Sequence, residues 1–405
     1  MSVQAQPMAK AAMVSATAFP ILLALSFSHL LNDLIQSLVP AIYPIIKDAY
    51  HLDFGQIGLI TFTFQIAASL LQPLVGMYTD RNPKPYSLVV GMGFTLAGLI
   101  VLAYAGSYPF LLAGAALIGT GSSIFHPEST RMARVASGGR HGFAQSLFQV
   151  GGQTGAALGP LLAAFIIVPH GQMSVAWFSV LALLAMVVMQ WVGRWYKAHL
   201  AGLAKAVAAT QKPREGADSA KVGLAVFILV VLMFSKSAYG ASLTSYYTFY
   251  LIHHFGVSVQ TSQYMLFLYL VANAVGNLFG GHLGDLIGRR KIIWFSILGG
   301  LPFTFALPYA GFYGTAVLTV LIGLIMASAF PAILVYAIEL LPGRIGMIGG
   351  LFYGLSFGLG GVSAALLGEM ADWTSIDAVY KACAFLPLIG LLTWFLPDIR
   401  NTKEA

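Results

Sequence analysis

The stretch that decides the fold is GHLGDLIGRRK, residues 281–291, which joins two long apolar runs. Its glycines permit close contact between helices, and its aspartate can cap a helix end while pairing with nearby arginines. A shorter version, GMYTDR, follows an earlier apolar run at residues 76–81. Asp80 therefore recurs as Asp285, at an offset of 205 residues. This repeat indicates that the chain consists of two related halves.

Apolar residues dominate the composition of the 405-residue chain. Residues of the Ala, Val, Ile, Leu, Met, Phe, Trp, Tyr and Cys set make up 58% of it and only 9% are charged, and the mean hydropathy is +0.81. A soluble fold of this size carries about a quarter of its residues charged, because they must cover its surface. The chain is therefore predicted to be an integral membrane protein that has the lipid bilayer as a partner.

Charge and cysteine content exclude several other classes. The net charge of +7 is compatible with nucleic-acid binding, but the basic residues stand in short clusters between apolar runs, as the positive-inside rule describes. We expect no nucleic-acid partner. The single cysteine, Cys383, excludes an internal disulfide framework and a cysteine-based zinc site. The first apolar run, near 19–46, is too long for a signal-peptide core and is interpreted as a retained helix.

Twelve runs are long enough to cross a bilayer, which needs about 20 mostly apolar residues. A polar segment at 197–221, interpreted as a linker, separates an N-terminal half (1–196) from a C-terminal half (222–405). The predicted fold class is thus an all-α membrane protein with twelve transmembrane helices in two six-helix repeats, the plan of a rocking transporter. The predicted spans lie near 18–46, 56–79, 86–105, 109–133, 142–168, 175–195, 222–252, 261–284, 291–310, 313–339, 346–368 and 378–397.

The distribution of Lys and Arg predicts the orientation. Eighteen of the 21 fall in loops and termini on one side of the predicted bundle. The positive-inside rule assigns that side to the cytoplasm, together with both termini. The protein is accordingly expected to be a multi-pass protein of the bacterial inner membrane.

Several motifs carry a resemblance to a known family. The segments at 281–291 and 76–81 resemble the loop signature of the major facilitator superfamily, and GGQTGAALGP at 151–160 resembles a motif of its proton-coupled antiporter branch. SHLLNDLIQS at 28–37 and GTGSSIFHPES at 119–129 are similar to members that export the phosphonate antibiotic fosmidomycin. Two features depart from the antiporter pattern: the fourth span lacks an early arginine, and Arg81 is followed by Asn-Pro.

The resemblance implies a secondary transporter that works by alternating access, exports a small anionic drug in exchange for protons, and needs no cofactor. It also implies that the first and seventh spans line the central cavity. We expect the protein to be a monomer. An uptake or exchange carrier for an organic anion such as a sugar phosphate remains an alternative on the same scaffold. The chain has no P-loop and no His-Glu-x-x-His motif, so we expect neither an ATP-driven pump nor an enzyme.

Ionisable residues within the predicted spans are the main site candidates, because each costs free energy there unless it is paired or solvated. Asp33 lies near the middle of the first span and Lys236 near the middle of the seventh. We predict that one set couples to protons: Asp33, Glu128, His126 and His29. A second set is predicted to bind substrate: Lys236, Arg131, Asn32, Gln36, Gln65, Gln149, Tyr239 and Tyr246. No metal site is expected.

Structural explanations stand beside these. In these explanations, Asp33 and Lys236 form an ion pair between two helices, Glu128 and Arg131 form an interfacial pair, and the histidines make ordinary hydrogen bonds. The loop signature is either a charge latch or a static anchor; its residues are Gly76, Asp80, Arg81, Gly281, Asp285, Arg289 and Arg290. Four further residues predict a helix-packing stripe that ends in a bend: Gly151, Gly155, Gly159 and Pro160.

Overall fold

A computed structural model describes residues 17–138, 140–207, 219–340 and 345–396, and all regular structure within these ranges is helical. The N-terminal half contains α1 (Phe19–Ala41), α2 (Tyr43–Tyr50), α3 (Phe54–Arg81), α4 (Ser87–Ala103), α5 (Tyr108–Ala136), α6 (His141–Leu162), η1 (Ala163–Ile167), α7 (Val168–His170), η2 (Gln172–Phe178) and α8 (Ser179–Val207). The C-terminal half contains α9 (Ser219–Phe255), α10 (Val259–Ile287), α11 (Arg289–Leu298), α12 (Leu301–Ala306), η3 (Leu307–Tyr309), α13 (Phe312–Ala327), α14 (Ala329–Leu340), α15 (Ile345–Trp373), α16 (Ile376–Cys383) and η4 (Leu386–Phe395).

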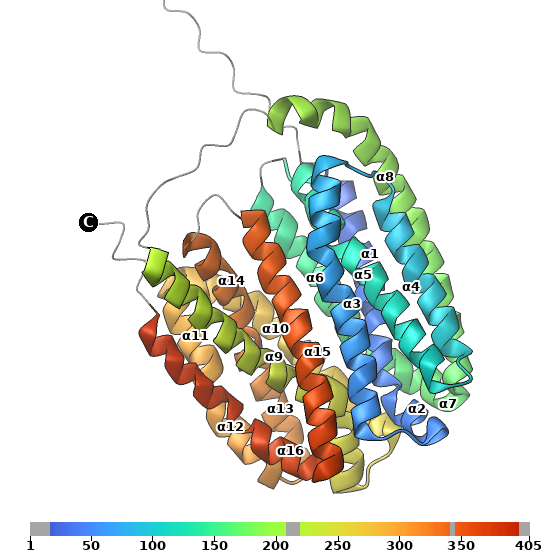
Figure 1. Cartoon of the computed structure of the whole chain (residues 1–405), viewed down its shortest axis with the longest axis vertical. Helices are drawn as coiled ribbons and strands as arrows, with labels where there is room; N and C mark the ends of the chain where they lie inside the picture. The colour runs from blue at the N-terminus through green and yellow to red at the C-terminus, as the bar shows by residue number, and fades with distance from the viewer. Residues whose placement is uncertain (1–16, 139, 208–218, 341–344, 397–405) are drawn as a thin grey trace, which may run out of the picture.

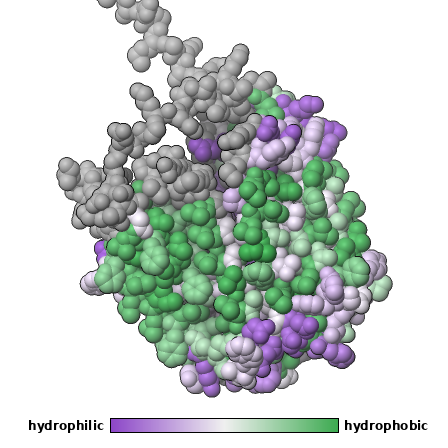
Figure 2. Space-filling model, in the orientation of Figure 1, coloured by the Kyte–Doolittle hydropathy of each residue, from purple (hydrophilic) through white to green (hydrophobic). Residues whose placement is uncertain are grey.

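The twelve predicted spans are present in the described part of the chain. Ten helical stretches are both long and apolar enough to cross a membrane, and the shorter apolar α4 and the long helix α10 complete the set. Large apolar side chains such as Leu70, Val187 and Phe227 are exposed on their outer faces. In Figure 2 these faces form an apolar belt between two polar ends. The predicted all-α membrane fold is thus confirmed.

The spans differ from the predicted ones in detail. The first is interrupted at Ile42, between Pro40 inside α1 and Pro44 in the first turn of α2. Proline has no amide hydrogen for the helix ladder but is well suited to begin a helix, so the run divides there. The tenth span is interrupted at Ser328, and the twelfth ends as the 3-10 helix η4. Helix α8 runs on to Val207, into the segment predicted as a linker.

The helices of each half pack mainly on one another, and the halves lie side by side (Figure 1). Across the boundary, α3 runs along α15, and α6 contacts α10. We call the end of the bundle where α3 begins the Asp53 end, and the opposite end, where α6 begins, the Arg140 end. Asp53 caps α3 in a capping box, in which its carboxylate accepts a hydrogen bond from Gln56 N at 2.6 Å and its amide donates to Gln56 Oε1 at 3.0 Å.

Candidate functional site

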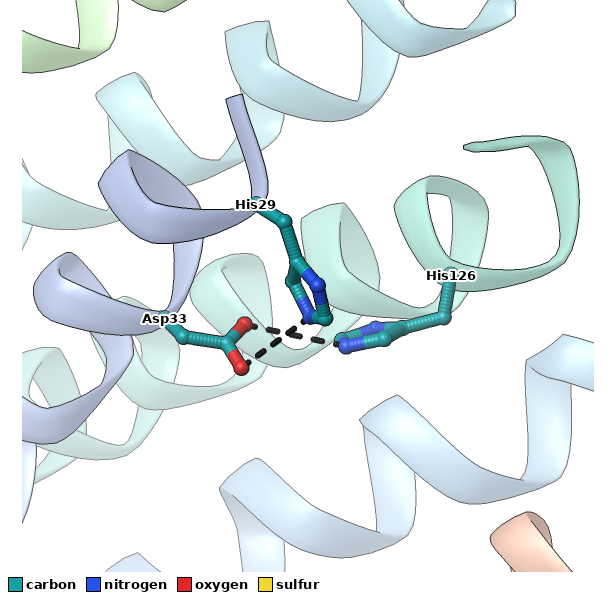
Figure 3. A group of neighbouring side chains, drawn as sticks. All are labelled: His29, Asp33 and His126. Atoms are coloured by element: carbon teal, nitrogen blue, oxygen red, sulfur yellow. Dashed lines mark ion pairs between the residues drawn. The ribbon is translucent and has the colours of Figure 1, made fainter. Parts of the chain in front are cut away.

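A group of three ionisable side chains joins α1 and α5 within the N-terminal half. Figure 3 shows the rings of His29 and His126 converging on the carboxylate of Asp33. His29 Nε2 lies 3.2 Å from Asp33 Oδ2, and His126 Nε2 lies 3.7 Å from Asp33 Oδ1. The two imidazole rings meet edge to face, with centroids 5.2 Å apart. We refer to these three residues as the His29–Asp33–His126 cluster.

Backbone carbonyls determine which nitrogen of each ring faces the carboxylate. His29 Nδ1 lies 2.8 Å from Phe148 O, and His126 Nδ1 lies 3.0 Å from Ser122 O. A carbonyl oxygen can only accept a hydrogen bond, so both Nδ1 atoms carry their hydrogen. Both Nε2 atoms therefore face Asp33. With neutral imidazoles and an ionised Asp33, a nitrogen lone pair would face a carboxylate oxygen in each of the two contacts.

The surroundings of Asp33 supply further hydrogen-bond donors. Asn32 Nδ2 donates to Asp33 Oδ1 at 3.0 Å, and Gln36 Nε2 approaches the same oxygen at 3.5 Å. Phe148 on α6 stacks on the His29 ring, with centroids 3.9 Å apart. A Cβ atom on Gly152, also on α6, would clash with the His29 ring and with the Asp33 carboxylate. Close approach of α6 thus encloses the cluster from one side.

Glu128 and Arg131, predicted to serve coupling and substrate binding, contact a different part of α5 and its neighbours. Arg131 Nη1 lies 3.0 Å from Glu128 Oε1, and Glu128 is fully buried. Ser87 Oγ at the start of α4 donates to Glu128 Oε2 at 2.8 Å. Arg131 Nη2 donates to Gly76 O at 3.2 Å and to Thr79 Oγ1 at 3.0 Å, near the end of α3. The pair therefore links α3, α4 and α5 at the Arg140 end.

Lys236 lies in the C-terminal half, on α9. It lines a cavity of about 40 Å³, which is space for a few water molecules. Among the described residues Lys236 has no acidic partner in an ion pair; its Nζ lies 5.2 Å from the centroid of the Phe330 ring. The structure thus places Asp33 beside histidines and Lys236 beside a small cavity. The other lining residues are Tyr239, Gly240, Tyr269, Asn273, Ile322 and Met326.

The remaining substrate candidates lie at the boundary of the two halves or beside this cavity. Gln149 Nε2 on α6 donates to Tyr353 Oη on α15 at 2.9 Å. Gln65 on α3 lies so close to Gly360 on α15 that a Cβ there would contact its side-chain amide. Tyr246 on α9 donates to Ala364 O at 2.6 Å, and is buried. Of the predicted set, only Tyr239 lines the cavity with Lys236.

Contacts at the Asp53 end connect the halves through backbone groups, and nothing in the sequence pointed to them. The carboxylate of Asp372, on α15, accepts hydrogen bonds from Phe54 N at 2.9 Å and Gly55 N at 2.6 Å, the first amides of α3. Gln263 Nε2 on α10 donates to Ala41 O at 2.8 Å, where α1 is interrupted. An aspartate near a helix C-terminus gives no sequence signal that it will cap another helix.

The predicted packing and latch residues are only partly described. Gly151, Gly155 and Gly159 are buried on α6, where added Cβ atoms would meet Ser26, Leu30 and Ser37 of α1. Pro160 lies two residues before the end of α6, which continues as the π-helix η1. Arg290 Nη2 donates to Trp394 O at 2.6 Å, and Arg289 has contacts of its own. The side chains of Asp80, Arg81 and Asp285, and the surroundings of Gly281, lie outside the described part of the structure.

Comparisons with known proteins agree with this architecture. The sequence model of the Major Facilitator Superfamily matches residues 25–250 and again residues 225–405. The chain is 59% identical, over 99% of both sequences, to the fosmidomycin resistance protein of Escherichia coli (strain K12). It is 39% identical to the MFS-type transporter YfnC of Bacillus subtilis (strain 168), over 96% of this chain and 95% of that one. The solved D-xylose–proton symporter has the same fold, with a TM-score of 0.76 at 15% identity over 95% of this chain and 99% of that one.

Proposed function

Because the chain belongs to the major facilitator superfamily, we propose that it is a proton-coupled exporter of fosmidomycin-like phosphonate antibiotics. Membership makes the protein a multi-pass membrane transporter rather than an enzyme. The observation that carries the proposed substrate is the 59% identity with the fosmidomycin resistance protein, which extends over 99% of both chains. Other drugs are possible additional substrates of the same site.

Lys236 supports the anionic nature of the substrate. A phosphonate carries negative oxygens that accept charge-assisted hydrogen bonds from an ammonium group. Lys236 offers such a group at a cavity that Tyr269 and Asn273 also line. The cavity is smaller than a drug molecule, so we infer that it receives only the anionic end of the substrate, or widens as the halves move.

The His29–Asp33–His126 cluster supports proton coupling. The two imidazole Nε2 atoms and the Asp33 carboxylate are groups that can each hold a proton, and each nitrogen lies within 3.7 Å of a carboxylate oxygen. A proton held there neutralises one carboxylate in a span, where an uncompensated charge is costly. We infer that Asp33 is the coupling carboxylate, that the two histidines exchange the proton with it, and that Glu128 with Arg131 instead holds α3, α4 and α5 together.

The distribution of basic residues supports a particular orientation of the protein in the inner membrane. It assigns the Arg140 end and both termini to the cytoplasm, and the Asp53 end to the outside. The hydrogen bonds of Asp372 and Gln263 then close the outer face. Export requires a second state in which these contacts are broken, as alternating access demands.

Fosmidomycin efflux from cells that lack their own exporter tests the proposal. Expression of the chain is expected to lower fosmidomycin susceptibility, and collapse of the proton gradient by a protonophore is expected to abolish efflux. Lys236→Gln is expected to restore susceptibility, whereas Lys381→Gln, which removes an exposed lysine, serves as a matched control. Full resistance in cells that express Lys236→Gln would contradict the substrate site. Gradient-independent counterflow of a sugar phosphate would instead favour the exchange carrier.

A further inference from the structure

The His29–Asp33–His126 cluster has the composition of a transition-metal site. One ligand atom from each residue lies within 4.8 Å of the other two, and in the described part of the chain this group alone meets that condition. Two imidazole nitrogens and one carboxylate oxygen are the donor set that proteins use for Zn²⁺ and similar ions. The hard ions Mg²⁺ and Ca²⁺ prefer oxygen ligands alone, so this donor set disfavours them.

The hydrogen bonds of the rings strengthen this assignment. Metal-binding histidines usually donate their second ring N–H to a carbonyl or carboxylate, which fixes the tautomer and the ring orientation. Phe148 O and Ser122 O accept such bonds from His29 and His126, at 2.8 Å and 3.0 Å. Both Nε2 lone pairs are thereby directed to the side of Asp33, where a metal would bind.

His29 Nε2 provides an independent indication of a bound metal ion. It is a buried nitrogen that lies 3.2 Å from Asp33 Oδ2, but the contact does not have the direction of a hydrogen bond. A buried nitrogen that lies close to a carboxylate oxygen but makes no hydrogen bond to it suggests a ligand placed between the two groups. Asp33 and His126 remain 22% and 16% exposed, so an ion can reach the group from outside the protein core.

From this geometry we propose that the cluster binds a single transition-metal ion of the Zn²⁺ class through His29 Nε2, His126 Nε2 and one Asp33 oxygen. Three protein ligands leave a fourth position for water. The metal would take the place of the proton, because metal ligands must be deprotonated. The transport consequence rests on the proposed proton coupling: bound Zn²⁺ is expected to inhibit gradient-driven export. The binding itself does not depend on that function.

Metal binding is measured on the purified full-length protein in detergent, with any purification tag removed and with neither substrate nor gradient present. Zn²⁺ titration by calorimetry is expected to give one site per protein. His29→Gln, His126→Gln and Asp33→Asn are each expected to weaken it at least about tenfold, as loss of a ligand must cost at least as much as loss of its orienting partner. Co²⁺ in place of Zn²⁺ is expected to give the visible absorption of a four-coordinate site with nitrogen and oxygen ligands.

A second histidine group supplies the matched control. His253 and His254 lie 3.2 Å and 2.7 Å from Asp377 at the exposed Asp53 end. His254→Gln is expected to leave the binding constant unchanged. If His254→Gln removes the site, or if no Zn²⁺ binds the wild-type protein, the proposal is wrong. X-ray absorption of the wild-type Zn²⁺ complex tests it without any variant, because a site without two imidazole ligands contradicts it.

Loss of binding and loss of the proposed function are distinguishable. A protein that exports fosmidomycin in a gradient-dependent way but binds no Zn²⁺ refutes only the metal site. A protein that binds Zn²⁺ at the cluster but exports no drug refutes only the proposed function.

Discussion

The two halves of the transporter hold opposite kinds of charged group at corresponding helices. In the N-terminal half, the first span carries Asp33, which two histidines surround within 3.7 Å. In the C-terminal half, the first span carries Lys236, which faces an aromatic ring and a small cavity instead of a carboxylate. A direct ion pair would hold the halves together and consume both charges. In the proposed mechanism, their separation leaves one half for the proton and the other for the anion.

The largest effect is expected from Asp33→Asn, which removes the titratable carboxylate of the N-terminal half. The amide cannot take up a proton, so gradient-driven efflux should fall to background while fosmidomycin binding to purified protein persists. Efflux at two external pH values and equilibrium binding measure the two properties. Asp48→Asn, at an exposed position, is the control. Loss of binding together with efflux would show that the two halves share one site.

Lys236→Gln, which removes the ammonium group of the C-terminal half, is expected to have the next largest effect. A hydrogen bond to a charged group contributes ~1.5–3 kcal/mol, so phosphonate binding should weaken about tenfold or more. Neutralising Asp33 as well should not restore it, because Lys236 has no ion pair with Asp33 to relieve. Binding measured in both single variants and the double variant tests this. Recovery in the double variant would contradict the separation of charges.

Asp372→Asn should have a smaller effect, on the balance between the two conformations. The side-chain amide retains one acceptor for the first turn of α3, where the carboxylate has two. A loss of about 1 kcal/mol would favour the state open at the Asp53 end roughly fivefold. Labelling of Ser245→Cys, which is buried on α9 beside Thr61 of α3, by an external thiol reagent should accelerate in this variant. Unchanged labelling would mean that Asp372 does not hold this end closed.

Glu128→Gln is expected to change transport least, although the residue is fully buried. It leaves Arg131 without its carboxylate partner, which should lower the free energy of unfolding by about 1–3 kcal/mol. Thermal unfolding of the purified protein measures that loss, while efflux per folded molecule should remain close to that of the unaltered chain. If the variant loses proton coupling but keeps normal stability, Glu128 takes part in proton coupling, as the sequence analysis predicts.

Sequence reasoning succeeds here where neighbours along one helix decide the structure. The 3.6-residue period places His29 and Asp33 on one face, and Glu128 next to Arg131, and both pairs are in contact in the structure. The addition of His126 to the first pair depends on how α5 is rotated against α1. Hydropathy does not specify that rotation, since polar and apolar faces of a buried helix are weakly distinguished.

Other features lay beyond sequence reasoning for a related reason. The carbonyls that orient the imidazoles, Phe148 O and Ser122 O, belong to the backbone, which every residue carries. Lys236 was correctly placed in the seventh span, but its neighbour Phe330 comes from α14, far along the chain.

The glycine stripe of α6 determines which parts of the molecule can move relative to one another. With hydrogen in place of side chains at Gly151, Gly155 and Gly159, α6 touches the α1 backbone along three successive turns, and sliding or twisting α1 would drive it into that surface. The two helices must therefore travel as one body. Spin labels on α1 and α6 should keep a constant separation throughout the transport cycle, whereas labels on α6 and α10 should separate and return with each turnover.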